Sequence, residues 1–248
     1  MPDSIEFHKK FANYTLLPWR YDPMDVTLFD PSASSIEHPG LTHRQAIPAI
    51  CKKVNAKTYI EIGYADGRCF SQVDAPVKIS VDPAPSGPGC THVMTSDDFF
   101  INKAPVLNKH GVKLDVSFID GLHVFEFALR DFIGVEKYSN KNSIVLFHDC
   151  LPRNKNEVTR IKCQPPWTGD VFKVLFALRK WRKDLVVMPM DSHPTGLGLV
   201  TNLDPDSTVL EENYTEIIKE FMDLTYEDIN FKEIYSIDEY LASGKGQV

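Results

Sequence analysis

Four short runs of apolar, mostly β-branched residues follow one another in the middle of this 248-residue chain, and each run ends in an acidic residue. Near-continuous apolar runs are typical of parallel strands that are covered on both faces. The segments between the runs are helical or rich in turns, and they leave room for crossover helices. The pattern therefore predicts an α/β fold, Rossmann-like and doubly wound, on a mostly parallel sheet. The runs are residues 58–61, 77–82, 116–120 and 144–149.

Two later runs, 184–190 and 196–201, are also expected to be strands. Only the short turn 191–195 joins them. A connection that short requires antiparallel pairing, because parallel strands need a long crossover. One reversed strand near an edge of the sheet is therefore expected.

Composition narrows the class of protein. With 27 basic and 34 acidic side chains the net charge is −7, so the basic surface expected of a nucleic-acid-binding protein is absent. No apolar run approaches the roughly 18 residues that suggest a membrane span, and residues 1–10 have no signal-peptide core. Five cysteines without CxxC spacing argue against a disulfide framework or a thiolate zinc site. We expect a soluble, cytoplasmic protein.

The chain is expected to divide into three parts. Residues 1–41 are broken by prolines and rich in aromatic side chains, so they either wrap the core or fold over a site as a lid. The domain itself is expected over 42–203, where helical periodicity begins after Thr42, a plausible helix cap. The acidic segment 204–248 has helical spacing and is expected to pack on the domain; a homo-oligomer face is the alternative.

The first two strand ends have the features of a nucleoside site. Gly63 permits a tight turn and Gly67 a close approach to a ligand, while Glu61 beside them suits a ligand with a positive group. Asp82, nineteen residues after Gly63, is placed to accept hydrogen bonds from both hydroxyls of a ribose. Ser96 either reaches an adenine amino group or begins a helix.

The other two strand ends carry Asp120, His148 and Asp149, with His123 close in sequence. Ligands of open parallel sheets bind beyond the carboxyl ends of the strands, so these side chains should share one crevice with the nucleoside site. Two carboxylates and an imidazole could hold a divalent cation, although Mg²⁺ prefers oxygen ligands. Alternatively, His148 or His123 takes a proton from an attacking hydroxyl or amine.

These residues resemble class I S-adenosylmethionine-dependent methyltransferases. The resemblance lies in Glu61-x-Gly63-x-x-x-Gly67, in the acid of 80–83 (SVDP) and in the reversed late strand. Residues 118–126 (FIDGLHVFE), 147–150 (FHDC) and 168–173 (TGDVFK) are similar to the branch of sugar and macrolide O-methyltransferases and cephalosporin-biosynthesis enzymes. The similarity covers about residues 42–203.

The resemblance implies a seven-stranded sheet with the last strand antiparallel. It also implies that Glu61, Gly63 and Gly67 hold the methionine part of the cofactor. Asp82 would bind its ribose, and Ser96 with Asp97 its adenine. Asp120 is also expected to contact the cofactor. Several relatives bind Mg²⁺ through an acid after the fourth strand and an acidic pair after the fifth. The matching positions are Asp120, His148 and Asp149, and the histidine puts a Mg²⁺ requirement in doubt.

The resulting hypothesis is methyl transfer from S-adenosylmethionine to an oxygen of a small molecule such as a sugar. Asp120, His123, His148 and Asp149 are the candidate catalytic residues. Two alternatives share the glycine turn and the ribose acid: an NAD-dependent oxidoreductase and a non-catalytic nucleoside-binding module. An acid stands where the pyrophosphate of NAD would lie, which disfavours the oxidoreductase.

Overall fold

The computed structural model describes residues 4–12, 30–160, 162 and 166–244. The strands are β1 (Thr58–Ile62), β2 (Val77–Val81), β3 (Leu114–Ile119), β4 (Ser139–His148), β5 (Val186–Asp191), β6 (Leu197–Thr201) and β7 (Tyr235–Ser236). The helices are α1 (Ser4–Ala12), α2 (His43–Val54), α3 (Ser96–Asn102), α4 (Ala104–Lys109), α5 (Phe125–Lys137), α6 (Lys173–Trp181), α7 (Val209–Glu212), α8 (Tyr214–Phe221) and α9 (Ile237–Ala242). All the strands and the helix after Thr42 that the sequence predicts are present.

The described strands form one seven-stranded sheet in the order β2-β1-β3-β4-β6-β5-β7. Strands β2, β1, β3 and β4 are parallel, and β6 is antiparallel to both of its neighbours, β4 and β5. The predicted fold class is confirmed, with β6 as the reversed strand. One detail differs: the last strand along the chain is β7, which comes from the C-terminal segment and pairs in parallel with β5.

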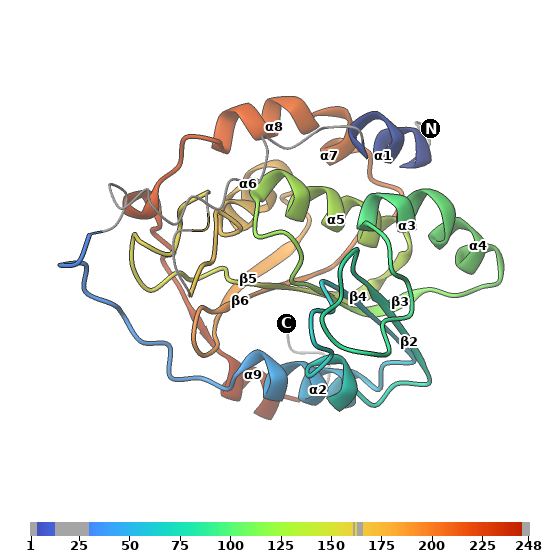
Figure 1. Cartoon of the computed structure of the whole chain (residues 1–248), viewed down its shortest axis with the longest axis horizontal. Helices are drawn as coiled ribbons and strands as arrows, with labels where there is room; N and C mark the ends of the chain where they lie inside the picture. The colour runs from blue at the N-terminus through green and yellow to red at the C-terminus, as the bar shows by residue number, and fades with distance from the viewer. Residues whose placement is uncertain (1–3, 13–29, 161, 163–165, 245–248) are drawn as a thin grey trace.

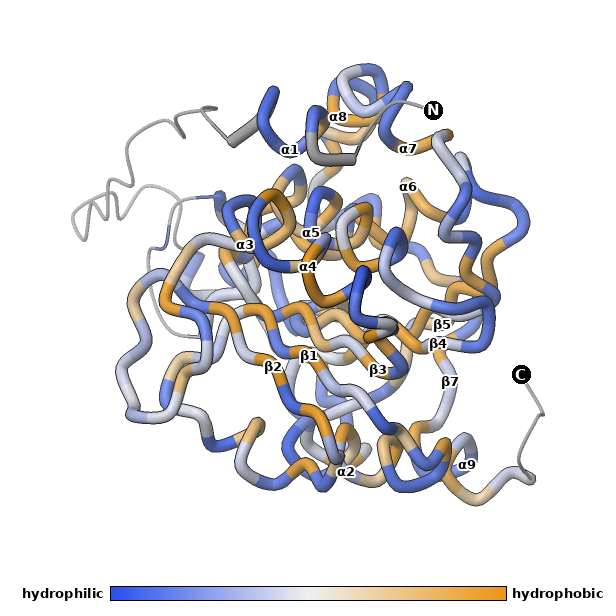
Figure 2. The backbone as a smooth tube through the Cα atoms, turned by 90° about the vertical axis from the view of Figure 1, so that its right-hand side faces the viewer, coloured by the Kyte–Doolittle hydropathy of each residue, from blue (hydrophilic) through white to orange (hydrophobic). Residues whose placement is uncertain are grey.

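Helices cover both faces of the sheet, as a doubly wound fold requires (Figure 1). One apolar layer joins the sheet to α5, α6 and α8, with Phe132, Leu175 and Ile217 fully buried in it. The opposite layer joins the sheet to α2 and α9 through Ile47, Ile50 and Ile237. The tube view shows the apolar strands running between these two layers (Figure 2).

The terminal segments pack on this core. In α1, the Phe7 ring meets Tyr214 of α8 edge to face, with 5.3 Å between ring centroids. The predicted lid or wrap cannot be assigned from α1, because the aromatic residues Tyr14, Trp19, Tyr21 and Phe29 lie outside the described residues. No described helix is long and apolar enough to cross a membrane.

Register places three strand ends side by side. Ile62 of β1 pairs with Ile119 of β3, which pairs with Phe147 of β4. The N–H of Asp120 continues the ladder by donating to the carbonyl of Ile62 at 2.8 Å. The residues that follow β1, β3 and β4 are therefore brought to one edge of the sheet, as the sequence predicts.

Candidate active site

A cavity of about 620 Å³ opens at this edge. It is bounded by the start of α2, the loops after β1, β2 and β3, the start of α3 and the end of β4. Seven of the ten predicted site residues line it, together with residues that the sequence did not single out. The polar and glycine residues on the walls are His43, Arg44, Gly63, Asp82, Thr95, Ser96, Asp97, Asp120, Gly121, His123, Asp131 and His148.

The loop after β1 needs glycine at Gly63. Its φ is +90°, and a Cβ at that position would lie 1.9 Å from the carbonyl oxygen of Asp120. Asp82 braces the same loop: Oδ2 accepts a hydrogen bond from the Ala65 N–H at 2.9 Å, and Oδ1 accepts one from the Ala84 N–H at 2.8 Å. A carboxylate fixed by two backbone donors is well placed to meet a ligand in the cavity.

Gly67 and Glu61 do not line the cavity. Gly67 has a φ of +73° and packs against Tyr64, whose hydroxyl oxygen lies 2.3 Å from the place of a Cβ. Glu61 is 2% exposed inside β1, and its Oε2 accepts a hydrogen bond from the Tyr59 hydroxyl at 2.5 Å. Both residues shape the loop from behind, because β1 turns the Glu61 side chain into the layer under α2. Their contact with a ligand stays a prediction.

Burial governs the ionisation of Glu61. Removal from water raises the pKa of its carboxyl group to about 7, although the Tyr59 hydroxyl favours the charged form. The protonated form is therefore the stable one in weak acid. Near neutral pH this carboxyl group is only partly ionised, so it carries less negative charge than the sequence interpretation assigned to it.

Asp97 has partners of its own. Its Oδ2 accepts a hydrogen bond from Nη2 of Arg130 at 2.6 Å, and His8 Nδ1 of α1 lies 2.9 Å from Oδ1. Arg130 is 2% exposed, so this is a buried ion pair. Asp97 lies on the cavity wall, and its carboxylate also joins α1, α3 and α5; its role at an adenine stays a prediction. Nothing in the sequence pairs these distant residues.

Ser96, the first residue of α3, faces the cavity and hydrogen-bonds Asp131 of α5. Burial raises the pKa of Asp131 to about 7. The sequence analysis placed no functional residue at position 131, because it lies within a helix, between Arg130 and Phe132. Together Ser96 and Asp131 offer both a hydrogen-bond donor and an acceptor at this end of the cavity.

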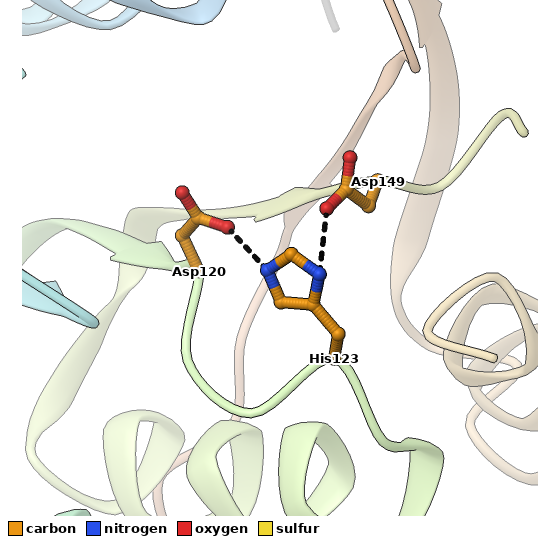
Figure 3. A group of neighbouring side chains, drawn as sticks. All are labelled: Asp120, His123 and Asp149. Atoms are coloured by element: carbon orange, nitrogen blue, oxygen red, sulfur yellow. Dashed lines mark hydrogen bonds and ion pairs between the residues drawn. The ribbon is translucent and has the colours of Figure 1, made fainter. Parts of the chain in front are cut away.

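Two carboxylates and two imidazoles meet at the other end. His123 lies between the acids: its Nε2 is 3.2 Å from Asp120 Oδ1 and its Nδ1 is 3.1 Å from Asp149 Oδ2 (Figure 3). His148 Nδ1 lies 3.2 Å from Asp120 and 3.3 Å from Asp149. All four predicted catalytic residues are thus brought together, although Asp149 itself is only 4% exposed and lies behind the two rings.

The backbone is strained at this cluster. His123 and Asp149 have φ values of +50° and +59°, which residues other than glycine seldom adopt. Contacts outside the cluster hold both side chains: Thr195 Oγ1 donates to Asp149 Oδ1 at 2.5 Å, and the His123 ring stacks on Trp167 with 5.2 Å between centroids. Positions that are held at this conformational cost are common at functional sites.

Charges inside the cluster stabilise one another. Burial acts to lower the pKa of His123, but the carboxylates of Asp149 and Asp120 outweigh it and raise that pKa to about 9. The same two acids hold the pKa of His148 well above its usual range. In return, the imidazoles hold the pKa values of both carboxyl groups below their usual range against the effect of burial.

His43 and Arg44, the first residues of α2, also line the cavity. The His43 ring meets His148 edge to face at 4.3 Å, and burial together with the charge of His148 lowers the pKa of His43 to about 4. The sequence analysis read this stretch only as the start of a helix. A signal was present: a helix that leads back into the start of a parallel strand, here β1, begins near the carboxyl edge of the sheet.

The described residues include one group with metal-ligand geometry. One ligand atom from each of Asp120, His123 and Asp149 lies within 4.8 Å of the others. The metal ligands expected from the sequence were Asp120, His148 and Asp149. The group in the structure has His123 in place of His148. Two carboxylates and an imidazole suit a borderline cation such as Mn²⁺ or Zn²⁺ better than Mg²⁺.

Residues 60–150 match a family model described as a methyltransferase domain. The matched part includes β1 to β4 and the loops that bound the cavity. The match bears out the predicted class of enzyme, an S-adenosylmethionine-dependent methyltransferase, over that part of the chain.

Solved structures with similarity to the chain include three methyltransferases. An SAH-bound methyltransferase of Podospora anserina is 13% identical over 82% of this chain and 89% of that chain, with a TM-score of 0.40. The O-methyltransferase TomG of Streptomyces achromogenes, involved in tomaymycin synthesis and in complex with SAM, is 13% identical over 81% and 90%, with a TM-score of 0.47. An O-methyltransferase of Bacillus cereus in complex with SAH is 11% identical over 79% and 90%, with a TM-score of 0.43. These likenesses are too low to carry an argument, and no curated protein matches the chain.

The buried state of Glu61 predicts a dependence of stability on pH. Between about pH 4.5 and 7 the unfolded chain releases the Glu61 proton while the folded chain keeps it, so the free energy of unfolding falls as the pH rises. Glu61→Gln should remove this contribution, on the order of 3 kcal/mol, leaving a decline of similar size from Asp131, whose pKa is also raised to about 7. Urea unfolding at pH 5 and pH 7 measures it, with exposed Glu212→Gln as control. An unchanged pH dependence in Glu61→Gln would refute the assignment.

The buried ion pair of Asp97 predicts a large loss of stability on substitution of its partner. Arg130→Met leaves a buried carboxylate with only His8 beside it and should lower the free energy of unfolding by about 3–5 kcal/mol. Lys219→Met, which removes an exposed ion pair with Glu216, should change it by less than about 1 kcal/mol. Equal effects of the two substitutions in denaturant unfolding would show that Asp97 does not depend on Arg130.

Proposed function

We propose that the chain transfers a methyl group from S-adenosylmethionine to an oxygen atom of a small molecule, such as a sugar or another natural product. One observation carries the proposal: a single cavity joins a glycine turn and a braced acid at one end to a cluster of carboxylates and imidazoles at the other. The first part suits a nucleoside, and the second suits a group that must lose a proton.

The cofactor is proposed to lie along the loops after β1 and β2. Asp82 would accept hydrogen bonds from the ribose hydroxyls, and Ser96 with Asp131 would meet the adenine edge. Gly63 lets the backbone approach the methionine part closely. The positive sulfonium is attracted by carboxylates at the cavity wall, of which Asp120 is one.

In the reaction, the acceptor oxygen forms a bond to the methyl carbon as the bond from that carbon to sulfur breaks. The sulfur keeps the electron pair, so a cationic sulfonium becomes a neutral thioether. The acceptor hydroxyl loses its proton to a group of the protein. Because the donor is already reactive, alignment of oxygen, carbon and sulfur can supply much of the rate.

The cluster of Asp120, His123, His148 and Asp149 is proposed to receive the acceptor hydroxyl. Asp120 and Asp149 hold the imidazoles in position from opposite sides of His123. His148 stands at the cavity wall and is proposed, in its deprotonated form, to take the proton, with His123 as the alternative base. Because Asp120 and Asp149 raise the pKa of both imidazoles, this form is populated only toward alkaline pH. The proton of the acceptor hydroxyl would pass to an imidazole that already contacts Asp120 and Asp149.

The donor atoms of Asp120, His123 and Asp149 also fit a divalent cation. Such a cation, when bound, would lower the pKa of the acceptor hydroxyl. These three residues would then hold it, and His148 would remain beside it to orient the acceptor. Asp149 is supported for either role by Thr195, which fixes the direction of its carboxylate.

Removal of the proposed base should slow turnover more than it weakens cofactor binding. His148→Ala and Asp149→Asn should each lower kcat by about 10²- to 10⁴-fold, measured as SAH formation with an acceptor found among hydroxylated small molecules. The Kd of SAH should change by less than about threefold, since neither side chain is proposed to bind the nucleoside. The exposed residue His110 gives a control, His110→Ala.

Full turnover by both variants would overturn this assignment of the site. Binding of NADH by the unmodified protein without any response to S-adenosylmethionine would instead favour an oxidoreductase. Binding of both nucleosides without turnover of any acceptor would favour a non-catalytic module.

Chelation tests the cation separately. If Asp120, His123 and Asp149 hold a divalent ion, EDTA should lower turnover by at least about tenfold and Mn²⁺ should restore it. Mn²⁺ binding, measured by calorimetry, should be lost in Asp120→Asn. Unchanged turnover after EDTA treatment would assign hydroxyl activation to the imidazoles alone.

A further inference from the structure

The cavity wall carries four acidic side chains, and these acids are mostly engaged. Asp82 accepts two backbone hydrogen bonds, Asp97 is paired with Arg130, and Asp120 lies between two imidazoles. Asp131 is held close to neutrality by burial. A ligand with a negative group therefore needs a cation on this wall that these acids do not already neutralise.

Arg44 is that cation. It lines the cavity, is half-buried, and forms no ion pair with a carboxylate in the described part of the chain. Its Nε is buried without a hydrogen-bond partner. A buried guanidinium N–H that lacks an acceptor is costly, and each such group in a folded protein calls for an explanation.

Two features of its position suit Arg44 to this role. Arg44 is the second residue of the twelve-residue helix α2 and lies at the positive end of its dipole, where the N–H groups of Gln45 and Ala46 already donate to the Thr42 carbonyl. Arg44 also shares the cavity wall with Gly63 and Ala65 of the loop of residues 63–67. The carboxylate of Asp66 in that loop is engaged by Arg68.

We propose that Arg44 binds the α-carboxylate of the methionine part of the cofactor. The inference rests on the proposed function, in which that part lies against Gly63. It also replaces the sequence-based assignment of the methionine part to Glu61, which lies behind the wall. The guanidinium Nε–H gains the acceptor it lacks, and the helix end faces a negative group.

The chemical difference between two ligands tests this contact. SAH carries the amino-acid group, whereas 5′-methylthioadenosine has the same nucleoside thioether without it. Arg44→Ala should weaken SAH binding by about 10- to 100-fold, the usual effect of losing a charge-assisted hydrogen bond. Binding of 5′-methylthioadenosine should change by less than about threefold. Calorimetry with the full-length protein gives both Kd values without any acceptor.

Two further variants sharpen the comparison. Arg44→Lys keeps the charge and should retain part of the affinity for SAH, because a lysine cannot reproduce the planar donor set. Arg68→Ala removes a neighbouring arginine that is exposed and already paired with Asp66, and it should leave both Kd values unchanged.

The outcomes separate this proposal from the proposed function. Equal weakening of both ligands in Arg44→Ala, or no weakening of SAH, would overturn the contact while leaving the methyltransferase proposal intact. No change in either Kd together with a raised KM for an acidic acceptor would place the carboxylate on the acceptor instead and would overturn the contact. Failure of the unmodified protein to bind either nucleoside would overturn both proposals.

Discussion

The parallel register of β1, β3 and β4 is the constraint on which the whole site depends. It ends three neighbouring strands at one level, and the hydrogen bond from Asp120 to the Ile62 carbonyl extends that alignment into the loops. Gly63 then passes so close to the Asp120 carbonyl that no side chain fits between them. A shift of register by one residue would turn every strand-end side chain to the opposite face of the sheet. Those side chains would then no longer line the cavity.

Electrostatics divides the cavity into two parts with different tasks. At one end the charges of two carboxylates and two imidazoles stabilise one another, which lets four ionisable groups share a mostly buried space. At the other end the acids are bound to backbone N–H groups or to Arg130, or are kept nearly neutral. Arg44, between the helix end and the glycine turn, is left to meet a negative group of a ligand. The strained backbone at His123 and Asp149 shows how tightly the surrounding contacts fix the first end.

The sequence predicted what depends on local pattern and topology. Apolar runs gave the strands, the short turn gave the reversed strand, and the rule for parallel sheets brought Asp82, Asp120 and His148 to one cavity. It was incomplete where the direction of a side chain or a distant partner decides: Glu61 points behind the wall, and the Asp97 carboxylate is also paired with Arg130 and His8. His43 and Arg44 were missed because helical periodicity says nothing about which edge a helix end reaches. The cytoplasmic location, the oligomeric state and the three-part division remain sequence predictions.

The central claim is that the methyl donor binds in this cavity, along the loops after β1 and β2. A crystal structure of the protein with SAH tests it most directly. The account predicts the ribose hydroxyls within hydrogen-bond distance of Asp82, with the sulfur directed toward the cluster of Asp120 and His148. A nucleoside bound elsewhere on the molecule, or reversed so that the adenine lies against that cluster, would contradict it.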